Sequence, residues 1–259
     1  MWRQVENLPP QPASPKWAGI MTDVFRMAWR TFHMSKAGHR VDEYEDAFAG
    51  DPDQGRFAIV DGASESAFAD TWARILVEAY VETPGPWSGW LDAARERWRV
   101  QVEGRELPWY AETKFAEGAF AAMLGLAFTK DRWIATAVGD CCFFQVRDQG
   151  LRRAFPMRHS RDFGNRPSLL SSRSRQVEQP RTRRFHLQGN FRAGDAVLLM
   201  TDALSQWFMQ QAEEGGQPWR DLQSLATDEQ FVEFMKDLRK AGKLRNDDVT
   251  LMLIQPWNS

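Results

Sequence analysis

The sequence has little cysteine, and the two cysteines it has cannot build a disulfide framework. Cys141 and Cys142 are adjacent in a chain of 259 residues. A bridge between neighbours would be strained, and two thiols alone make a poor zinc site. The four histidines show no HExxH-type spacing either. We therefore expect both cysteines to be reduced and partly buried, with a packing role.

Long apolar runs are also missing. The longest nearly unbroken one, residues 119–128, is about half of the ~20 residues that span a bilayer. The first six residues, MWRQVE, lack the apolar region of a secretory signal. Disorder is excluded by composition, because 43% apolar residues can form a core that offsets the entropy of ordering the chain. We expect a soluble, cytoplasmic protein without membrane contact.

Charge is nearly balanced overall but unevenly distributed. The net charge is −2, yet residues 152–184 hold ten arginines and two acids, which gives +8 and leaves −10 for the remainder. Prolines and serines in this segment predict an exposed, irregular insertion. Nucleic-acid binding has little support, because few aromatic residues are interleaved with the arginines. Contact with a phosphorylated or acidic protein suits guanidinium groups better, and a solvated loop is the ordinary explanation for any single arginine.

Apolar periodicity predicts an α+β domain with helices in pairs between groups of strands. Four prolines in residues 1–16 predict an extended lead-in, followed by one domain over 17–259 with the basic insertion at about 152–184. The predicted strands are 25–34, 56–60, 119–128, 133–138, 143–146, 196–200 and 249–254. The predicted helices are 64–81, with Ser64 as its N-terminal cap, 90–102, 204–211 and 229–240.

Acidic residues mark the ends of four apolar strands. They are Asp61, Asp202, the pair Asp247 and Asp248, and the pair Glu45 and Asp46. One such Asp usually caps a turn. Four strand ends that converge would place carboxylates together, and their repulsion would require cations. Oxygen ligands select Mg²⁺ or Mn²⁺, and two such ions can activate a water for in-line attack on phosphorus.

At this point the sequence resembles the type 2C metal-dependent serine/threonine phosphatases, from about residue 30 to 254. The resemblance rests on an ordered set of motifs: EDAF at 45–48, DG at 61–62, VGD at 138–140, LLMTDAL at 198–204 and NDDVT at 246–250. It implies a four-layer α-β-β-α sandwich, in which helix pairs flank a central antiparallel β-sandwich. It also implies a site for two Mn²⁺ or Mg²⁺ ions at one end of that sandwich.

The resemblance assigns metal-binding roles by position. Asp61 matches the carboxylate that bridges both ions, and Gly62 matches the residue whose carbonyl binds one of them. Asp202 and Asp247 match the other ligands. Asp140 matches an acid that can bind a third ion in bacterial members, but Gln206 stands where a second acid of that third site is expected.

Three further residues acquire catalytic roles by the same comparison. Glu45 and Asp46 match acids that hold metal-bound waters, and we count Asp46 among the metal-site residues as well. Arg40 is the best candidate for the arginine that binds the substrate phosphate, although it lies six residues before Asp46 and one fewer is expected.

The motifs also depart from the family pattern. The sequence ASES follows Asp61-Gly62 where a Gly-Gly-His turn is usual, so no histidine is present there as general acid. Ala203 replaces a glycine, and Cys141-Cys142 replace Ser-Arg. Protonation of the leaving group would fall to a metal-bound water or another group.

Two functions of different classes remain. The first is a monomeric protein phosphatase that hydrolyses phosphoserine or phosphothreonine by attack of metal-bound hydroxide, with a phosphoprotein substrate and a kinase-regulated partner. In this case the basic insertion would be a flap that steers phosphoproteins to the site. The alternative is a catalytically weak or inactive phosphatase-like module that docks a regulatory partner. A nucleic-acid binder, the third hypothesis, would lose affinity steeply with salt.

Overall fold

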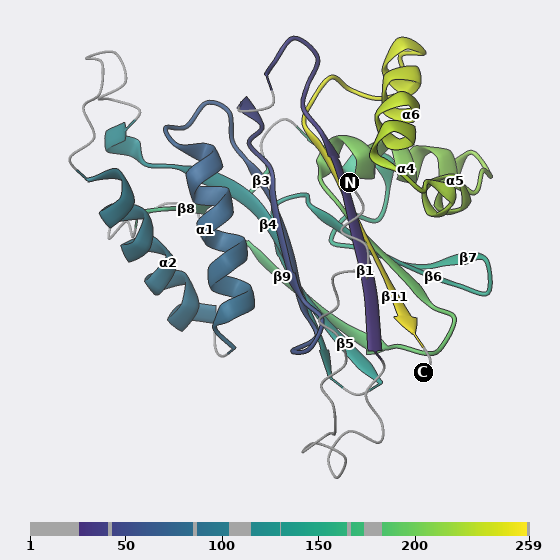
Figure 1. Cartoon of the computed structure of the whole chain (residues 1–259), viewed down its shortest axis with the longest axis horizontal. Coiled ribbons are helices and arrows are strands. Elements are labelled where there is room, and N and C mark those ends of the chain that lie inside the picture. Colours follow the sequence, from purple (N-terminus) through teal and green to yellow (C-terminus); the bar gives the residue numbers. More distant parts are fainter. Residues whose placement is uncertain are drawn as a thin grey trace.

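The computed structural model describes residues 26–40, 43–84, 87–103, 115–129, 131–164, 167–173 and 183–257. Two antiparallel β-sheets pack face to face, and helices cover the outer face of each sheet (Figure 1). This arrangement confirms the α+β class and the α-β-β-α layering expected from the sequence.

The first sheet has the strand order β1-β11-β10-β6-β7. Its strands are β1 (Arg26–Met34), β11 (Val249–Trp257), β10 (Ala196–Met200), β6 (Cys142–Arg147) and β7 (Gly150–Phe155). The second sheet has the order β2-β3-β4-β5-β9, with β8 paired to β4. Its strands are β2 (Ala47–Asp51), β3 (Arg56–Gly62), β4 (Phe120–Thr129), β5 (Arg132–Val138), β8 (Leu170–Ser171) and β9 (Arg184–Asn190).

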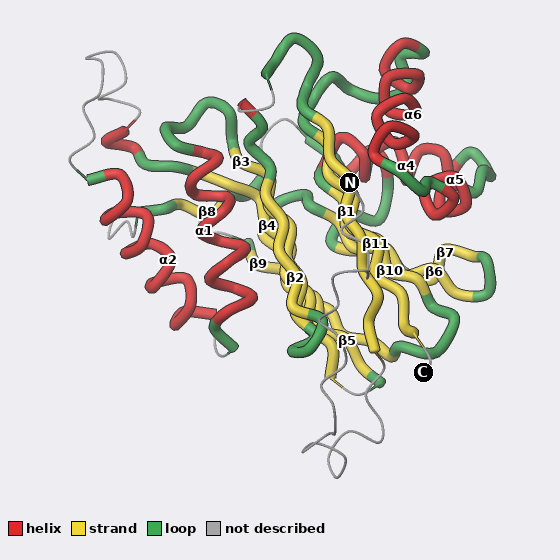
Figure 2. The backbone as a smooth tube through the Cα atoms, in the orientation of Figure 1, coloured by secondary structure: helices red, strands yellow, loops and turns green. Residues whose placement is uncertain are grey.

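The helices form two outer layers around the sandwich (Figure 2). Helices α1 (Ala69–Glu82) and α2 (Trp87–Val102) lie beside the second sheet. Helices α4 (Asp202–Glu213), α5 (Pro218–Ser224) and α6 (Asp228–Lys240) lie beside the first sheet, and a short 3-10 helix, η3 (Ser160–Asp162), contacts α4. Three separate apolar clusters fill the interfaces between the four layers, so every sheet face is covered.

Successive side chains of a strand point to opposite faces of the sheet, so each sheet contributes residues to two of these clusters. Phe57 and Ile59 on β3 point into the central cluster between the sheets, whereas Ala58 and Val60 pack against α1. On β10, Leu198 packs toward the helices and Leu199 toward the central cluster. Strands that are buried on both faces appear in the sequence as continuous apolar runs, so they could be predicted from the sequence.

Several expected boundaries were wrong. Helix α1 begins at Ala69 with Phe68 as its N-cap, so Ser64 lies in the preceding turn and does not cap it. Helix α4 begins at Asp202, and α5 was missed because seven residues are too few for a clear period. The basic segment is not wholly irregular: it includes most of β7, all of β8 and the first residue of β9.

Both cysteines are reduced, as expected, but they are fully buried and not partly buried. Trp207 and Trp219 belong to the core beneath α4 and α5. None of the helices in the described ranges has the length and apolar character needed to cross a bilayer.

Candidate metal centre

Strand pairing brings the strand-end acids to one end of the sandwich. In the second sheet Ala47 pairs with Val60, so Asp46 and Asp61 occupy the next opposed positions. In the first sheet Met200 pairs with both Leu251 and Cys142. The residues just beyond these pairs are Asp202, which follows β10, Asp247 and Asp248, which precede β11, and Asp140, which precedes β6.

Asp46 and Asp248 are the buried anchors of this end. Asp46 is 6% exposed and accepts a hydrogen bond of 2.6 Å from the Thr250 hydroxyl. Asp248 is 5% exposed and accepts backbone N–H bonds of 2.8 Å from Lys36 and from Glu45. Asp248 therefore connects the chain after β1 and the chain before β2 to the start of β11, and both of its carboxylate oxygens bind backbone N–H groups.

The remaining acids perturb one another. Burial and the charges of Asp46 and Asp202, with smaller contributions from Asp140 and Asp247, raise the pKa of Asp61 well above its ordinary value. Burial, followed by the charge of Asp202, raises the pKa of Asp140 to about 7. Such shifts are the physical mark of buried carboxylates that lack enough positive charge nearby.

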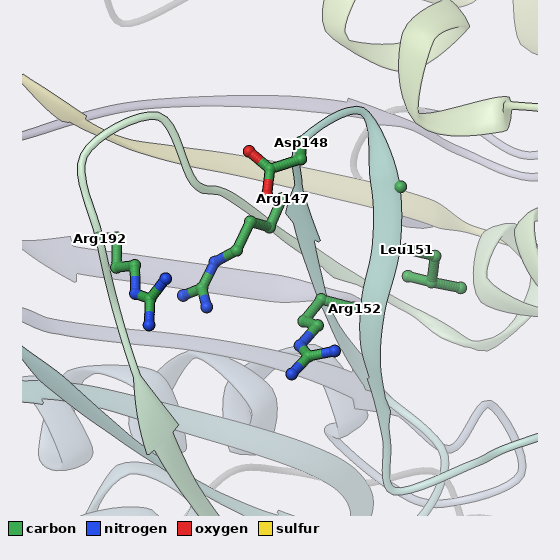
Figure 3. Close-up of a pocket in the computed structure, with 6 residues that line it drawn as sticks. Arg147, Asp148, Leu151, Arg152 and Arg192 are labelled. Atoms are coloured by element: carbon green, nitrogen blue, oxygen red, sulfur yellow. The ribbon is translucent and has the colours of Figure 1, made fainter.

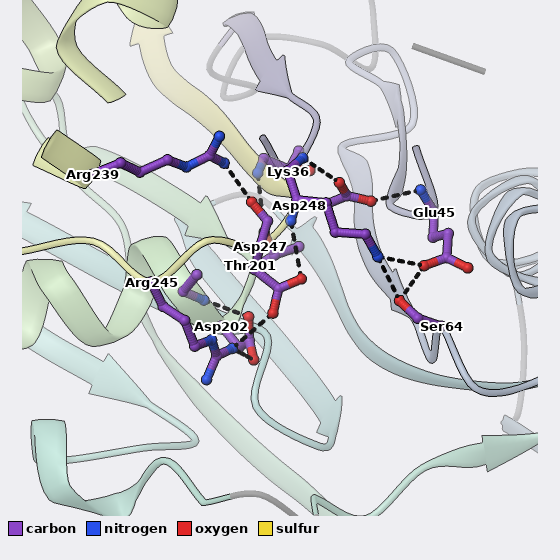
Figure 4. A network of polar contacts seen from close by, with 11 residues as sticks. Lys36, Glu45, Ser64, Thr201, Asp202, Arg239, Arg245, Asp247 and Asp248 are labelled. Carbon is purple, nitrogen blue, oxygen red and sulfur yellow. Dashed lines mark hydrogen bonds and ion pairs between the residues drawn. The ribbon is translucent and has the colours of Figure 1, made fainter. Parts of the chain in front are cut away.

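Arg245 supplies part of that missing charge. Its guanidinium donates to the Asp202 carboxylate and lies 3.2 Å from Asp247 (Figure 4). Burial, opposed by this arginine, leaves the pKa of Asp202 raised. Within the described residues no three Asp, Glu, His or Cys side chains already form a metal site. The acids are thus neighbours, and an arginine stands between two of those expected to be ligands.

A second cation lies at the rim of the cluster. The Lys36 ammonium donates to the Ser64 hydroxyl at 3.0 Å and lies 3.4 Å from a Glu45 oxygen, and Ser64 in turn donates to Glu45 (Figure 4). The Lys36 side chain is only 15% exposed. Sequence reasoning missed both Lys36 and Arg245, because neither stands at a position of the motifs.

Arg40 is placed differently from these two cations. It lies in the exposed turn after β1, where its backbone N–H donates to Glu43 at 2.6 Å. Its role in binding phosphate stays a prediction.

Gly62 sits where no side chain fits. A Cβ built on it would lie 2.7 Å from the Glu45 carbonyl oxygen and 3.1 Å from that of Ala69. The close approach of these backbone segments keeps the end of β3 against the start of α1. A glycine at this position is therefore required by packing, whatever else its carbonyl does.

The donor set fits divalent ions of the hard type. All the candidate side chains are carboxylates and several are buried, and burial together with the neighbouring carboxylates raises the pKa values of Asp46, Asp61 and Asp140. Oxygen-only sites with high negative charge favour Mg²⁺ or Mn²⁺ over zinc or copper. A divalent ion would offset the repulsion more fully than one arginine does.

Known proteins share both the sequence pattern and the fold. The pattern of the protein phosphatase 2C family matches residues 33–249. The Mycobacterium tuberculosis serine/threonine phosphatase PstP/Ppp is 17% identical with a TM-score of 0.61, and the similarity covers 90% of this chain and 99% of that one. No curated protein sequence matches significantly.

Two further solved structures resemble this chain. PstP in complex with two manganese ions has a TM-score of 0.61 at 17% identity and covers 91% of this chain and 100% of its own. PppA of Pseudomonas aeruginosa, a regulatory component of a type VI secretion system, has a TM-score of 0.56 at 18% identity and covers 90% of this chain and 99% of its own. At such identities these likenesses show the fold, and the match of the family pattern over most of the sequence shows that the chain belongs to the protein phosphatase 2C family.

Proposed function

We propose that the chain is a metal-dependent phosphatase that hydrolyses phosphoserine or phosphothreonine in proteins. The observation that carries this proposal is the group of acids at one end of the sandwich, whose burial and mutual repulsion raise their pKa values. Membership of the protein phosphatase 2C family supports the phosphatase class. The acids supply the oxygen ligands that the reaction needs, and no nucleophilic side chain of the protein is required.

Each acid has a distinct task in this proposal. Asp61, the Gly62 carbonyl, Asp202 and Asp247 would hold two Mn²⁺ or Mg²⁺ ions, with Asp140 beside them. When bound, such ions activate water and neutralise the charge of the phosphate. Asp46 is fixed by the Thr250 hydroxyl, so it can accept a hydrogen bond from an ordered water without moving. Glu45, held by Ser64 and Lys36, would do the same at the rim.

We further propose that Lys36 binds the substrate phosphate, together with or in place of Arg40. Its ammonium lies at the solvent edge of the acid cluster with one carboxylate and one hydroxyl as neighbours. A phosphate that reaches the acids would pass within reach of this cation. A lysine binds phosphate as a point charge without a fixed fork, so it tolerates different ester groups.

The test is hydrolysis of a small aryl phosphate by the whole chain, with Mn²⁺ and with EDTA. We expect activity only with the metal, and loss of at least a hundredfold in Asp202→Asn, because one ligand of the ions is removed without a change of shape. Asp221→Asn, on the exposed face of α5, is the matched control and should behave as wild type. Equal activity of wild type and Asp202→Asn with every divalent ion would refute the proposal.

One observation favours the second candidate, a phosphatase-like module that binds a partner with little or no turnover. Arg245 already neutralises Asp202 and Asp247, and no metal site is preformed among the described residues. In that case calorimetry should detect no Mn²⁺ binding at millimolar metal. Binding without hydrolysis would also assign the chain to this class.

The location and partners of the enzyme follow as proposals. We propose that it acts in the cytoplasm as a monomer on phosphorylated proteins, with a partner controlled by a kinase. The flap proposed for the basic insertion depends on Arg173, Arg175, Arg181 and Arg183. Of these, Arg175 and Arg181 lie outside the described residues, and Arg173 donates to the Phe115 carbonyl and lies over the Trp98 and Phe115 rings. Arg173 therefore has a packing role.

A further inference from the structure

A second charged feature lies at the opposite end of the same strands. Asp140 precedes β6 and Arg147 ends it, while Asp202 follows β10 and Asp195 precedes it. Seven residues of extended chain separate Asp140 from Arg147, which places the two ends roughly 20 Å apart. Anything that binds at the arginine end is therefore distinct from the proposed metal centre.

Arginines line two adjoining hollows at this end. The hollows have volumes of about 340 and 290 Å³, and both are lined by Arg147, Arg152 and Arg192. Arg153 lines the second hollow as well. The guanidinium groups of the three shared arginines point into the space between the β6–β7 hairpin and the loop before β10, whereas Leu151 points away (Figure 3).

A hydrogen-bond network holds Arg147, which lines both hollows. Asp195, 2% exposed, accepts two bonds from the Arg147 guanidinium at 2.6 and 2.7 Å and one of 2.8 Å from Gln145. The backbone N–H of Arg192 donates to the same carboxylate at 2.9 Å. Burial would raise the pKa of Asp195, but these bonds lower it overall, so the carboxylate stays charged and holds Arg147 in place.

The charge at the rim is not balanced. Asp195 offsets Arg147, and Asp148 stands at the hairpin turn. Within the described residues the guanidinium groups of Arg152 and Arg192 form no ion pair and no hydrogen bond, and the Arg153 guanidinium donates only to the backbone of Arg152. Four arginines against two acids leave a charge of about +2 in a concave site. Such sites attract anions strongly, because walls of protein concentrate the field.

A buried donor without a partner lies in the same place. Trp133 is fully buried and lines the second hollow, and its indole N–H has no hydrogen-bond acceptor in the described part of the chain. Gly189, its neighbour on β9, makes room for the ring, because a Cβ there would lie 2.4 Å from it. The indoles of Trp98, Trp207 and Trp219 also lack an acceptor among the described residues, but of these four only Trp133 lines one of the two hollows. A buried N–H without an acceptor is costly, and a ligand oxygen that reached this nitrogen would satisfy it.

We propose that this pocket binds a small molecule that carries two phosphate groups. Two joined hollows that share their arginines suit two linked anionic groups better than one. Guanidinium forks on three sides match tetrahedral phosphate oxygens, and the Trp133 N–H adds a neutral donor at depth. The nearby Arg147–Asp195 pair is preorganised, so little ordering is needed on binding. The site does not depend on the proposed phosphatase activity.

The test is calorimetric titration of the metal-free protein in EDTA with inorganic pyrophosphate, inorganic phosphate and citrate. Without metal the acid cluster repels anions, and the double arginine variant separates binding at the arginine pocket from binding at any other cation. We expect pyrophosphate to bind at least about tenfold more tightly than phosphate or citrate. The double variant Arg152→Gln/Arg192→Gln should weaken it by about a hundredfold, about tenfold for each lost charge-assisted contact. Arg161→Gln, an exposed arginine of η3, is the matched control and should bind as wild type.

A second readout places the ligand. In ¹H–¹⁵N spectra the indole signal of Trp133, assigned by its loss in Trp133→Phe, should move on addition of pyrophosphate in wild type and not in the double variant. Thermal melting of both arginine variants verifies that they are folded, and the exposure of these side chains predicts little change. Failure to bind at millimolar pyrophosphate, binding that the double variant retains, or citrate binding as tightly as pyrophosphate would each overturn the proposal.

Discussion

Replacement of Arg245 by glutamine tests how the acid cluster is neutralised when metal is absent. The arginine contacts Asp202 and Asp247, two of the proposed ligands, so metal binding at these acids must compete with it. The variant keeps the side chain polar, shortens it and removes its charge. We expect the metal-free protein to become less stable and its affinity for Mn²⁺ to increase.

The magnitude follows from the burial of the pair. Exposed ion pairs contribute about 0.2–1 kcal/mol, whereas loss of one partner from a buried pair costs about 3–5 kcal/mol. The Arg245 side chain is 42% exposed and that of Asp202 is 15% exposed. Solvent screening therefore places this pair near the lower range, and we take about 1–2 kcal/mol. The melting temperature of the metal-free variant should fall by about 2–8 °C.

The same free energy should reappear in metal binding. An arginine that stabilises the metal-free state by about 1–2 kcal/mol weakens the competing metal by about 5- to 30-fold, so its removal should tighten Mn²⁺ binding by that factor. Calorimetric titration of Mn²⁺ into wild type and variant measures it. Arg99→Gln is the matched control, because Arg99 also pairs with two carboxylates but on the exposed face of α2. Unchanged or weaker Mn²⁺ affinity in Arg245→Gln would refute the reasoning.

Three further substitutions test the centre. Lys36→Met should raise KM for an aryl phosphate about tenfold with a smaller effect on kcat, because a cation that contacts the phosphate is lost; an unchanged KM would remove Lys36 from substrate binding. Burial and nearby carboxylates raise the pKa of Asp140 from 3.8 to about 7. The folded state therefore binds the Asp140 proton more tightly than the unfolded state does. Because of this difference, the contribution of Asp140 to the free energy of unfolding is lost as pH rises from about 4 to 7. Asp140→Asn should therefore gain stability over wild type across that window in EDTA, as followed by thermal melting, and a pH-independent difference would contradict this. Gly62→Ala should destabilise the fold by about 1–3 kcal/mol in urea titrations, because its Cβ meets the Glu45 and Ala69 carbonyls; a neutral result would show that the backbone there can shift.

Much of the fold was predictable because its signals are local. Strands such as β4 and β10 are apolar runs bounded by turns, and the stripe on α1 follows helical spacing around Trp72 and Leu76. Ser64 was assigned as a helix cap from the same local reasoning, and this was wrong. Its hydroxyl instead meets Glu45 and Lys36, residues from other elements, and no local pattern encodes such contacts.

In the candidate site, too, some residues could be predicted from local sequence and others could not. Acids at strand ends can be recognised in sequence, because they directly precede or follow apolar runs. Whether they converge depends on strand order, and the pairing of β10 with both β6 and β11 is a property of the whole sheet. The cations were missed for this reason: Lys36 and Arg245 matter only through the side chains that tertiary folding brings to them.

The roles of the arginines in the basic segment depend on their positions in the fold and could not be inferred from the composition of the segment. Its charge of +8 suggested one surface with one partner, yet its described arginines serve separate ends of the molecule. Arg152 and Arg153 lie on β7 and line the arginine pocket, whereas Arg173 packs over aromatic rings near α2. Because β7 is an edge strand, its charged side chains also oppose pairing with another sheet edge. If the arginine pocket binds a ligand with two phosphate groups, neutralising Arg152 should reduce that binding and leave hydrolysis at the acid cluster intact. This result would separate the two uses of positive charge in one chain.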